Sequence, residues 1–318
     1  MGKIEIDHTG ANAGITLSSD GTSLLLDGTA IGGTALELYA ENPSSPTAPS
    51  ATGTNAVAIG SESVSAGLRS ISLGDSYASG TDSFAAAITN NTSSYGATGA
   101  NSVAMGNLAK ATSYYSISIG WNNSAGNRSL AIGGQGSTAG DNSVCVGTWQ
   151  SNISNAYSAA VGGGKASDRG VQNRWAYGLV SAPAVGAAQG GLHVEYAQTT
   201  DATPTVLKTN SSPVNTQNQV ILPNNSAYAF HGTIVARQQA SAGTACAAWK
   251  IEGLIRREAN AASTVLVNSA LTVLDNTPAW GMAFSADTTN GGLKIEVTGA
   301  ASTNIRWVAT INTSEVTY

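Results

Sequence analysis

The sequence predicts an all-β protein in which a parallel β-roll, or solenoid, precedes an antiparallel β-sandwich. Three observations lead to this prediction. A six-residue unit recurs eight times between residues 55 and 162. Charged residues make up 10% of the 318-residue chain, against roughly 25% in an ordinary soluble domain, so small polar residues must supply its surface. After residue 170, segments of alternating apolar and polar residues are separated by turn-rich sequences, as in antiparallel sheets.

Each repeat unit is predicted to build one coil of the roll. The units are NAVAIG (55–60), RSISLG (69–74), DSFAAA (82–87), NSVAMG (101–106), YSISIG (115–120), RSLAIG (128–133), NSVCVG (142–147) and YSAAVG (157–162). Large and small residues alternate within a unit, which is typical of a strand, and a fixed period indicates stacked coils. The closing glycines are predicted to occupy corners of positive φ. Ala87 replaces the glycine in the third coil, which an insertion at 90–95 lengthens.

The alternation also predicts a homotrimer. A coil this short encloses small side chains, so the large side chains of each unit are expected to point outward and form the trimer interface: Val57, Ile59, Ile71, Leu73, Val103, Met105, Ile117, Ile119, Leu130, Ile132, Val144 and Val146, followed by Ala159 and Val161. Such a stripe is too large an apolar patch for a monomer. Burying it could contribute roughly 20–40 kcal/mol per chain as an upper bound. The opposite assignment, with the large residues inside, keeps the roll but weakens the prediction of an oligomer.

The C-terminal part is predicted to be an antiparallel, jelly-roll-like sandwich. Strands are expected within 220–239, 246–258, 263–275, 291–299 and 304–316. Leu293, Ile295 and Val297 alternate with polar residues, and the pair Asn290-Gly291 before them is a hairpin signal. Several short strands joined by regular turns are typical of this architecture. The predicted domains are therefore 1–50, 51–170 and 171–318.

The repeat unit N-S-V-A-[IM]-G, preceded by turns such as ATG (51–53), resembles the head repeat of trimeric autotransporter adhesins, the YadA-like head. The resemblance covers about 51–162 and implies a left-handed β-roll that associates as a homotrimer. No signal peptide, heptad stalk or membrane-anchoring segment is visible in this sequence. A bacterial surface adhesin is therefore not expected.

The C-terminal part resembles another family. The segments WAYG (175–178), TTDATPTVL (199–207), LPNNSAYAF (222–230), WKIEGLIRREANAAST (249–264) and SADTTNGGLKIEVTG (285–299) look like the C-terminal domain of tailed-bacteriophage fibre and appendage proteins. This resemblance implies a trimeric structural protein of the virion. The short alternating segments of residues 1–50 are then expected to attach to other virion proteins, with 41–55 as a linker.

Catalytic chemistry is not predicted. The carboxylates of the roll do not recur at one position of neighbouring coils, and His8, His193 and His231 lie in separate segments. The sequence therefore predicts neither an enzyme nor a cofactor or metal site. A net charge of −5 argues against binding of nucleic acid, and no apolar run is long enough to insert into a membrane.

Binding of a receptor is the chemistry that remains. Sugar rings stack on aromatic side chains, and the candidate residues in or beside the turns of the roll are Tyr77, Tyr114, Tyr115, Trp121 and Trp149. These residues could equally cap neighbouring coils. We expect a homotrimeric phage fibre that attaches the virion to a host surface polysaccharide or outer-membrane protein. The alternative is a purely structural virion component, such as a capsid fibre or appendage connector, without a receptor of its own.

Overall fold

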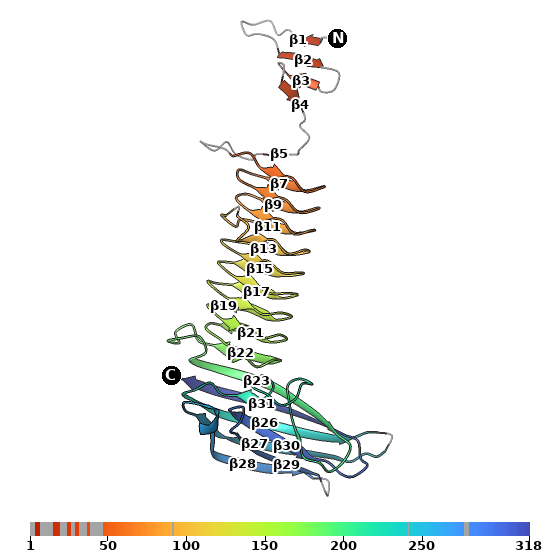
Figure 1. Cartoon of the computed structure of the whole chain (residues 1–318), viewed down its shortest axis with the longest axis vertical. Helices are drawn as coiled ribbons and strands as arrows, with labels where there is room; N and C mark the ends of the chain where they lie inside the picture. The colour runs from red at the N-terminus through yellow and green to blue at the C-terminus, as the bar shows by residue number, and fades with distance from the viewer. Residues whose placement is uncertain are drawn as a thin grey trace.

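The computed structural model describes residues 4–6, 15–19, 24–26, 29–31, 37–38 and 47–318, apart from 91, 241 and 277–279. A column of stacked coils leads into a wider sheet at the C-terminal end (Figure 1). The described regular elements are strands, with one 3₁₀ turn, η1 (Ala261–Ser263). In the described part of the chain, no helix is long and apolar enough to cross a membrane.

Four short strands lie near the N-terminus. These are β1 (Ile4–Ile6), β2 (Ile15–Ser19), β3 (Leu24–Leu26) and β4 (Thr29–Ile31), which form an antiparallel sheet in that order. Their backbones agree with the short strands expected there. Glu37–Leu38 (β5) pairs in parallel with β7 (Val57–Ile59) of the first coil. Ser50–Ala51 (β6), inside the expected linker 41–55, pairs in parallel with β8 (Val64–Ser65), so the end of that linker belongs to the roll. Residues 39–46 of the expected attachment segment and linker lie outside the described residues.

The repeats build a parallel roll with two sheets. Its longer strands are β7 (Val57–Ile59), β9 (Ile71–Leu73), β11 (Phe84–Ala86), β13 (Val103–Met105), β15 (Ile117–Gly120), β17 (Leu130–Gly133), β19 (Val144–Thr148), β21 (Ala159–Gly163) and β22 (Arg174–Gly178). The second sheet contains β6 (Ser50–Ala51), β8 (Val64–Ser65), β10 (Tyr77–Ala78), β12 (Gly96–Ala97), β14 (Lys110–Ala111), β16 (Ser124–Ala125), β18 (Thr138–Ala139) and β20 (Asn152–Ile153). The nine long strands from β7 to β22 correspond to about nine turns of a solenoid.

Small side chains fill the interior of the roll. The central residue of each unit, for example Ala58, Ala104 and Ala131, is fully buried, whereas its larger neighbours remain partly exposed. The prediction that small residues point inward is confirmed, and the opposite assignment is wrong. The reason is the width of the coil: its two sheets are too close together for two rows of branched side chains.

The second residue of most units is a buried serine that closes the turn before it. The Ser102 hydroxyl donates to the Gly99 carbonyl at 2.6 Å, and that of Ser83 donates to the Gly80 carbonyl at 2.7 Å. A Cβ atom on Gly80 would lie 1.8 Å from the carbonyl oxygen of Gly99 in the next coil. The recurrent turn glycine is therefore required by the close stacking of the coils.

Each coil turns at left-handed corners. Every predicted corner glycine has a positive φ, among them Gly60 at 98° and Gly106 at 101°. Ala87, at the same place in the third coil, keeps a φ of 54°. A second corner lies at the first residue of each unit, where asparagine and aspartate are frequent because they tolerate this conformation better than most residues.

The roll continues directly into the C-terminal sheet. Residues 173–178 read NRWAYG, which is a ninth copy of the unit with Arg174 in place of the serine. β22 pairs in parallel with β21 and antiparallel with β23 (Ala188–Thr199). The predicted domain boundary after residue 170 thus falls directly before the last parallel strand, β22.

Two antiparallel sheets form the C-terminal part. The larger continues from β23 through β31 (Ile305–Thr317), β26 (Ser226–Gln238) and β27 (Cys246–Arg257) to the edge strand β28 (Val265–Asp275). The smaller contains β24 (Thr205–Val206), β30 (Gly292–Thr298), β25 (Val220–Ile221) and β29 (Gly281–Asp287). The larger sheet is continuous with the roll, so the predicted sandwich is not a separate body.

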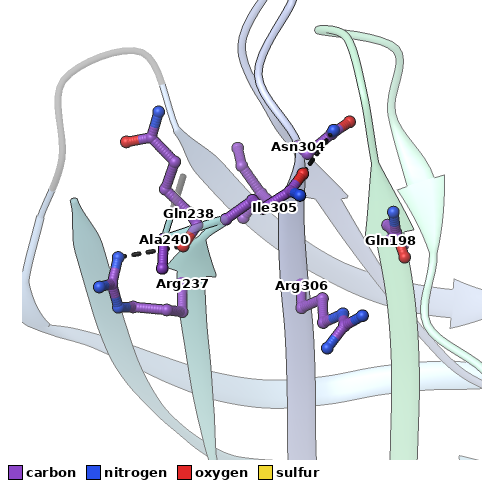
Figure 2. Close-up of a pocket in the computed structure, with 8 residues that line it drawn as sticks. Gln198, Arg237, Gln238, Ala240, Asn304, Ile305 and Arg306 are labelled. Atoms are coloured by element: carbon purple, nitrogen blue, oxygen red, sulfur yellow. Dashed lines mark hydrogen bonds between the residues drawn. The ribbon is translucent and has the colours of Figure 1, made fainter. Parts of the chain in front are cut away.

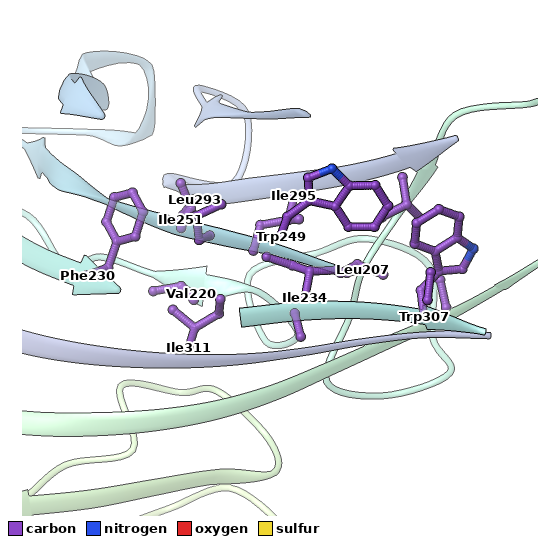
Figure 3. Close-up of a cluster of buried hydrophobic side chains, with 14 of the residues drawn as sticks. Leu207, Val220, Phe230, Ile234, Trp249, Ile251, Leu293, Ile295, Trp307 and Ile311 are labelled. Atoms are coloured by element: carbon purple, nitrogen blue, oxygen red, sulfur yellow. The ribbon is translucent and has the colours of Figure 1, made fainter. Parts of the chain in front are cut away.

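One hydrophobic core lies between these two sheets (Figure 3). The Trp249 ring stacks on Trp307 with centroids 5.7 Å apart, and Trp280 contacts Trp307 at 5.8 Å. Leu293 and Ile295 of β30 face them and are fully buried. The alternation predicted for residues 291–299 is confirmed, as is the hairpin at Asn290-Gly291 between β29 and β30.

Candidate functional site

The five predicted receptor residues lie in three places on the roll. Tyr77 is half-buried in β10. Tyr114 and Tyr115, which are 62% and 56% exposed, stand at the corner before β15. Trp121 follows the other end of β15, and Trp149 follows β19. The structure therefore brings together the two tryptophans and leaves the tyrosines outside their cluster.

Trp121 and Trp149 make an edge-to-face pair, with ring centroids 6.4 Å apart and an interplanar angle of 77°. Backbone hydrogen bonds between coils place them. The Gly136 amide donates to the Trp121 carbonyl, and the Gln150 amide donates to the Gln135 carbonyl. The two tryptophans are thus two coils apart, with the coil that bears Gln135 between them. Both remain exposed, by 46% and 36%, so the pair leaves aromatic surface open to solvent.

A shallow groove of about 530 Å³ lies beside this pair. It is lined by the amide side chains of Asn122, Gln135, Gln150 and Asn152, with Thr138, Ser151, Gly136 and Val185 completing it. The Thr138 hydroxyl donates to Asn152 Oδ1 at 3.1 Å, which orients that amide. Amides offer both donors and acceptors to the hydroxyl groups of a sugar, and aromatic rings offer it a stacking surface. Sequence reasoning found the rings but missed the amides between them.

The twelve predicted interface residues all lie on the outer face of the roll. Ile71, Met105 and Val144 are 37–39% exposed, and the other nine are half-buried. They stand in register on successive coils, as in Val103–Ile117–Leu130. Neighbouring coils already cover most of each side chain. Burying the rest between chains therefore contributes less free energy than the upper bound of roughly 20–40 kcal/mol per chain expected from the sequence. Their role as an interface between chains stays a prediction.

The apolar outer face continues past the last predicted residue. Trp175 and Tyr177 of β22, 47% and 53% exposed, extend the ladder of the roll. Because β23 pairs with β22, the same face then carries Leu192 and Val194. Sequence reasoning missed this continuation, although the ninth copy of the unit at 173–178 was a usable signal.

A buried ionic cluster joins the roll to the C-terminal sheet. Arg174 points inward, as the serines of the other coils do, and forms an ion pair with Glu315 in which both side chains are fully buried. Gln189 Nε2 donates to Glu315 Oε2 at 2.8 Å, and the Thr313 hydroxyl donates to Oε1 at 2.5 Å. Burial alone would raise the pKa of Glu315, but the Arg174 charge and these hydrogen bonds lower it to about 2.

Two further titratable groups are buried on β23. Burial, followed by the charge of Arg174, lowers the pKa of His193 to about 3. Burial raises the pKa of Glu195 to about 8. The Val220 backbone favours the charged form of Glu195 but offsets this burial only in part, and the ring nitrogens of His193 have no hydrogen-bond partner among the described residues. Both side chains are therefore neutral at pH 7 and destabilise the fold when they are forced to ionise.

Glu195→Gln is expected to stabilise the protein above pH 5. Between pH 4.5 and 8 the unfolded chain loses the Glu195 proton while the folded chain retains it, so stability falls by about 1.4 kcal/mol per pH unit. Glutamine does not ionise, so the stability of the variant does not fall with pH in this way. The variant should be more stable than the wild type by about 3 kcal/mol at pH 7. Urea unfolding from pH 4 to 8 measures the effect, with the exposed Glu252→Gln as control. Equal pH slopes in wild type and Glu195→Gln would contradict the expectation.

No group of three or more His, Cys, Asp or Glu side chains able to hold a metal ion occurs among the described residues. Burial, followed by the charge of Glu62, raises the pKa of Asp75, so these two carboxyl groups of neighbouring coils interact. His231 is exposed on β26, and His8 lies outside the described residues.

A sequence profile of the YadA head domain repeat matches this chain twice, at residues 51–76 and 97–123. These segments contain β7 to β9 and β13 to β15, and each begins at the last residue of the strand before them, β6 or β12. The roll contains YadA head repeats. The two matched segments contain eight of the twelve predicted interface residues and the first of the two paired tryptophans, whereas the C-terminal sheet lies outside both matches.

The chain is similar over 81% of its length to the solved structure of the tailspike protein gp49 from the Acinetobacter baumannii bacteriophage Fri1, a capsular polysaccharide depolymerase. The sequence identity is 12% and the TM-score is 0.25. The similar region spans 40% of that tailspike. A TM-score this low does not establish a common fold. No curated protein matches the chain.

Proposed function

We propose that this chain is a homotrimeric fibre of a phage virion that attaches the particle to the surface of its host. The observation that carries the proposal is the apolar outer face, which runs without interruption along the roll and onto the C-terminal sheet. An exposed patch of this extent is typical of an interaction surface. The YadA head repeats add support, because the family that the sequence resembles associates as trimers.

The groove beside Trp121 and Trp149 is the proposed contact with a receptor glycan. Its lining contains amide side chains and no charged residue, and Asn122 and Gln150 of that lining directly follow the two paired tryptophans in the chain. Three such grooves in one trimer would bind a repetitive surface polymer with an avidity far above the affinity of one groove. Residues 1–50 are proposed to hold the fibre on other virion proteins.

Removing the two indoles is expected to abolish most adsorption. Labelled full-length protein should bind to susceptible cells, and the double variant Trp121→Ala/Trp149→Ala should bind at least about tenfold more weakly. Tyr157→Ala is the control, because Tyr157 is a 61% exposed aromatic residue at another corner of the roll. The measurement is cell-bound fluorescence over a panel of encapsulated and acapsular strains. Equal binding by all three proteins would contradict the assignment of the groove.

A purely structural virion component is the alternative, and the edge strand β28 favours it. Val265, Val267, Leu271 and Val273 are 44–52% exposed on this edge. A long apolar edge is a ready site for pairing with another protein. Immuno-electron microscopy of the virus that encodes the chain separates the two functions, because a connector would have its C-terminal sheet covered by a partner.

We propose no enzymatic activity. The interacting carboxyl groups of Glu62 and Asp75 are the pair to test, since paired carboxylates hydrolyse glycosides. Release of reducing ends from host polysaccharide by the wild-type protein, lost in Asp75→Asn, would overturn this part of the proposal.

A further inference from the structure

A second cluster of polar side chains lies far from the roll groove, at the free ends of three strands of the larger C-terminal sheet. A depression of about 360 Å³ is lined there by Gln198 of β23, Arg237 at the end of β26 and Arg306 of β31, with Asn304 at its rim. An adjoining depression of about 370 Å³ shares Gln198 and adds Tyr196 and Lys208. Figure 2 shows the first of these depressions.

The register of the sheet places two like charges side by side. Arg306 lies directly opposite Arg237 on β26 and opposite Gln198 on β23. Like charges that face each other on neighbouring strands destabilise a sheet. None of the described carboxylates forms an ion pair with Arg237, Arg306 or Lys208, and no aspartate or glutamate lines either depression. Two uncompensated arginines therefore line the first depression and Lys208 lines the second, in a chain whose net charge is −5.

The two arginines differ in how firmly they are held. Arg237 Nη1 donates to the carbonyl oxygens of Gln238 and Gly243 at 3.0 and 3.2 Å, which orients its guanidinium group. Arg306 is exposed and makes no hydrogen bond to a described side chain or carbonyl. The two guanidinium groups point to opposite sides of the depression (Figure 2). They are therefore arranged to meet two separate anionic groups rather than to clamp a single one.

The other lining groups fit a sugar. The Tyr196 hydroxyl donates to Gln198 Oε1 at 3.2 Å, so the amide is oriented while the tyrosine ring stays 45% exposed. Asn304 Nδ2 donates to Gln239 Oε1 at 2.8 Å. An aromatic surface and oriented amides are the groups that contact pyranose rings and hydroxyls, and guanidinium groups bind carboxylate or phosphate.

The site lies where a long ligand can reach it. β22 covers β23 only from Gln189 to His193, so Gln198 belongs to the part of the sheet that extends sideways beyond the coils (Figure 1). We propose that these two joined depressions bind an acidic saccharide, with Arg306 and Arg237 each contacting one anionic substituent and Gln198 and Tyr196 contacting the sugar between them. This inference rests on the proposed attachment function and names the chemical class of its ligand.

The test measures binding of defined glycans to the full-length protein by isothermal calorimetry. The probes are oligogalacturonate, which carries carboxylates, a phosphorylated dextran, which carries phosphates, and neutral dextran. We expect binding of at least one acidic probe, weakened by salt, and none of neutral dextran at this site. Arg306→Gln should lower the affinity about tenfold or more, because it removes charge-assisted hydrogen bonds. A carboxylate or phosphate preference identifies the anionic group.

The matched control is Arg256→Gln. Arg256 is an exposed arginine of β27 that pairs with Glu258 at 2.9 Å, so its removal lowers the net charge equally without touching the depressions. Failure of every acidic probe to bind, an unchanged affinity in Arg306→Gln, or equally tight binding of inorganic polyphosphate would overturn the site. Cell adsorption separates this failure from that of the proposed function. Wild-type adsorption to cells without binding of any acidic probe overturns the site alone, whereas glycan binding without any adsorption overturns the attachment function alone.

Discussion

Replacing Ile117 and Ile119 by aspartate is expected to reduce the assembly from three chains to one. Both side chains lie on the outer face of β15, on either side of the buried Ser118. Each outer aliphatic side chain is already mostly covered by its neighbours. Association therefore gains about 0.5–1 kcal/mol per position, or about 6–12 kcal/mol per chain over the twelve positions. Two carboxylates per chain in an apolar interface cost several kcal/mol each, which is enough to prevent association at micromolar concentration.

Sedimentation equilibrium measures this result directly. The wild-type mass should be three times 31.9 kDa, and that of the double variant should be a single chain with an unchanged β-sheet circular dichroism spectrum. Thr112→Asp adds a charge at an exposed corner of the preceding coil and should remain trimeric. A wild-type protein that sediments as one chain, or a double variant that stays assembled, would show that the outer face is not the interface.

Arg174→Met is expected to destabilise the C-terminal part by about 3–5 kcal/mol at pH 7, because it leaves the Glu315 carboxylate buried without its main partner. Arg169 replaces that partner only in part, since its Nε lies 3.8 Å from Glu315 Oε2 and donates no hydrogen bond to it. Unfolding in urea can be followed by the fluorescence of Trp249, Trp280 and Trp307, which are buried in the C-terminal core. Protein concentration must be held constant, because assembly adds to apparent stability.

Acid should reduce the effect of Arg174→Met. In the wild type, the depressed pKa of Glu315, about 2, adds stability that is fully present above about pH 4.5 and is lost as the pH falls toward 2. In the variant, no arginine charge lowers the pKa of the Glu315 carboxyl group, which therefore takes up its proton at higher pH. The variant thus lacks most of this stabilisation already at pH 7. The two unfolding curves should therefore converge below pH 4. A double variant Arg174→Met/Glu315→Gln should regain much of the lost stability. A constant difference from pH 7 to 3 would contradict this account of the ion pair.

The roll could be predicted from the sequence because its contacts repeat locally. Each coil pairs with residues about fourteen positions away, as in Val103 with Ile117 and Leu130 with Val144. The inward serine and alanine, the outward branched residues and the corner glycines therefore appear as one period. The same logic found Trp121 and Trp149 at the turns, but not that the coil of Gln135 stands between them, since this requires the register of three coils.

A narrow parallel roll with an apolar outer face could be inferred from residue order alone, since size alternation and glycine spacing act between adjacent coils. The groups that meet at the end of that roll became visible only in the folded chain. Arg174 meets Glu315 across 141 positions, and Gln198, Arg237 and Arg306 meet through the register of three antiparallel strands. Such pairings depend on the register of long strands that are joined by large loops. A local pattern of side chains does not predict that register.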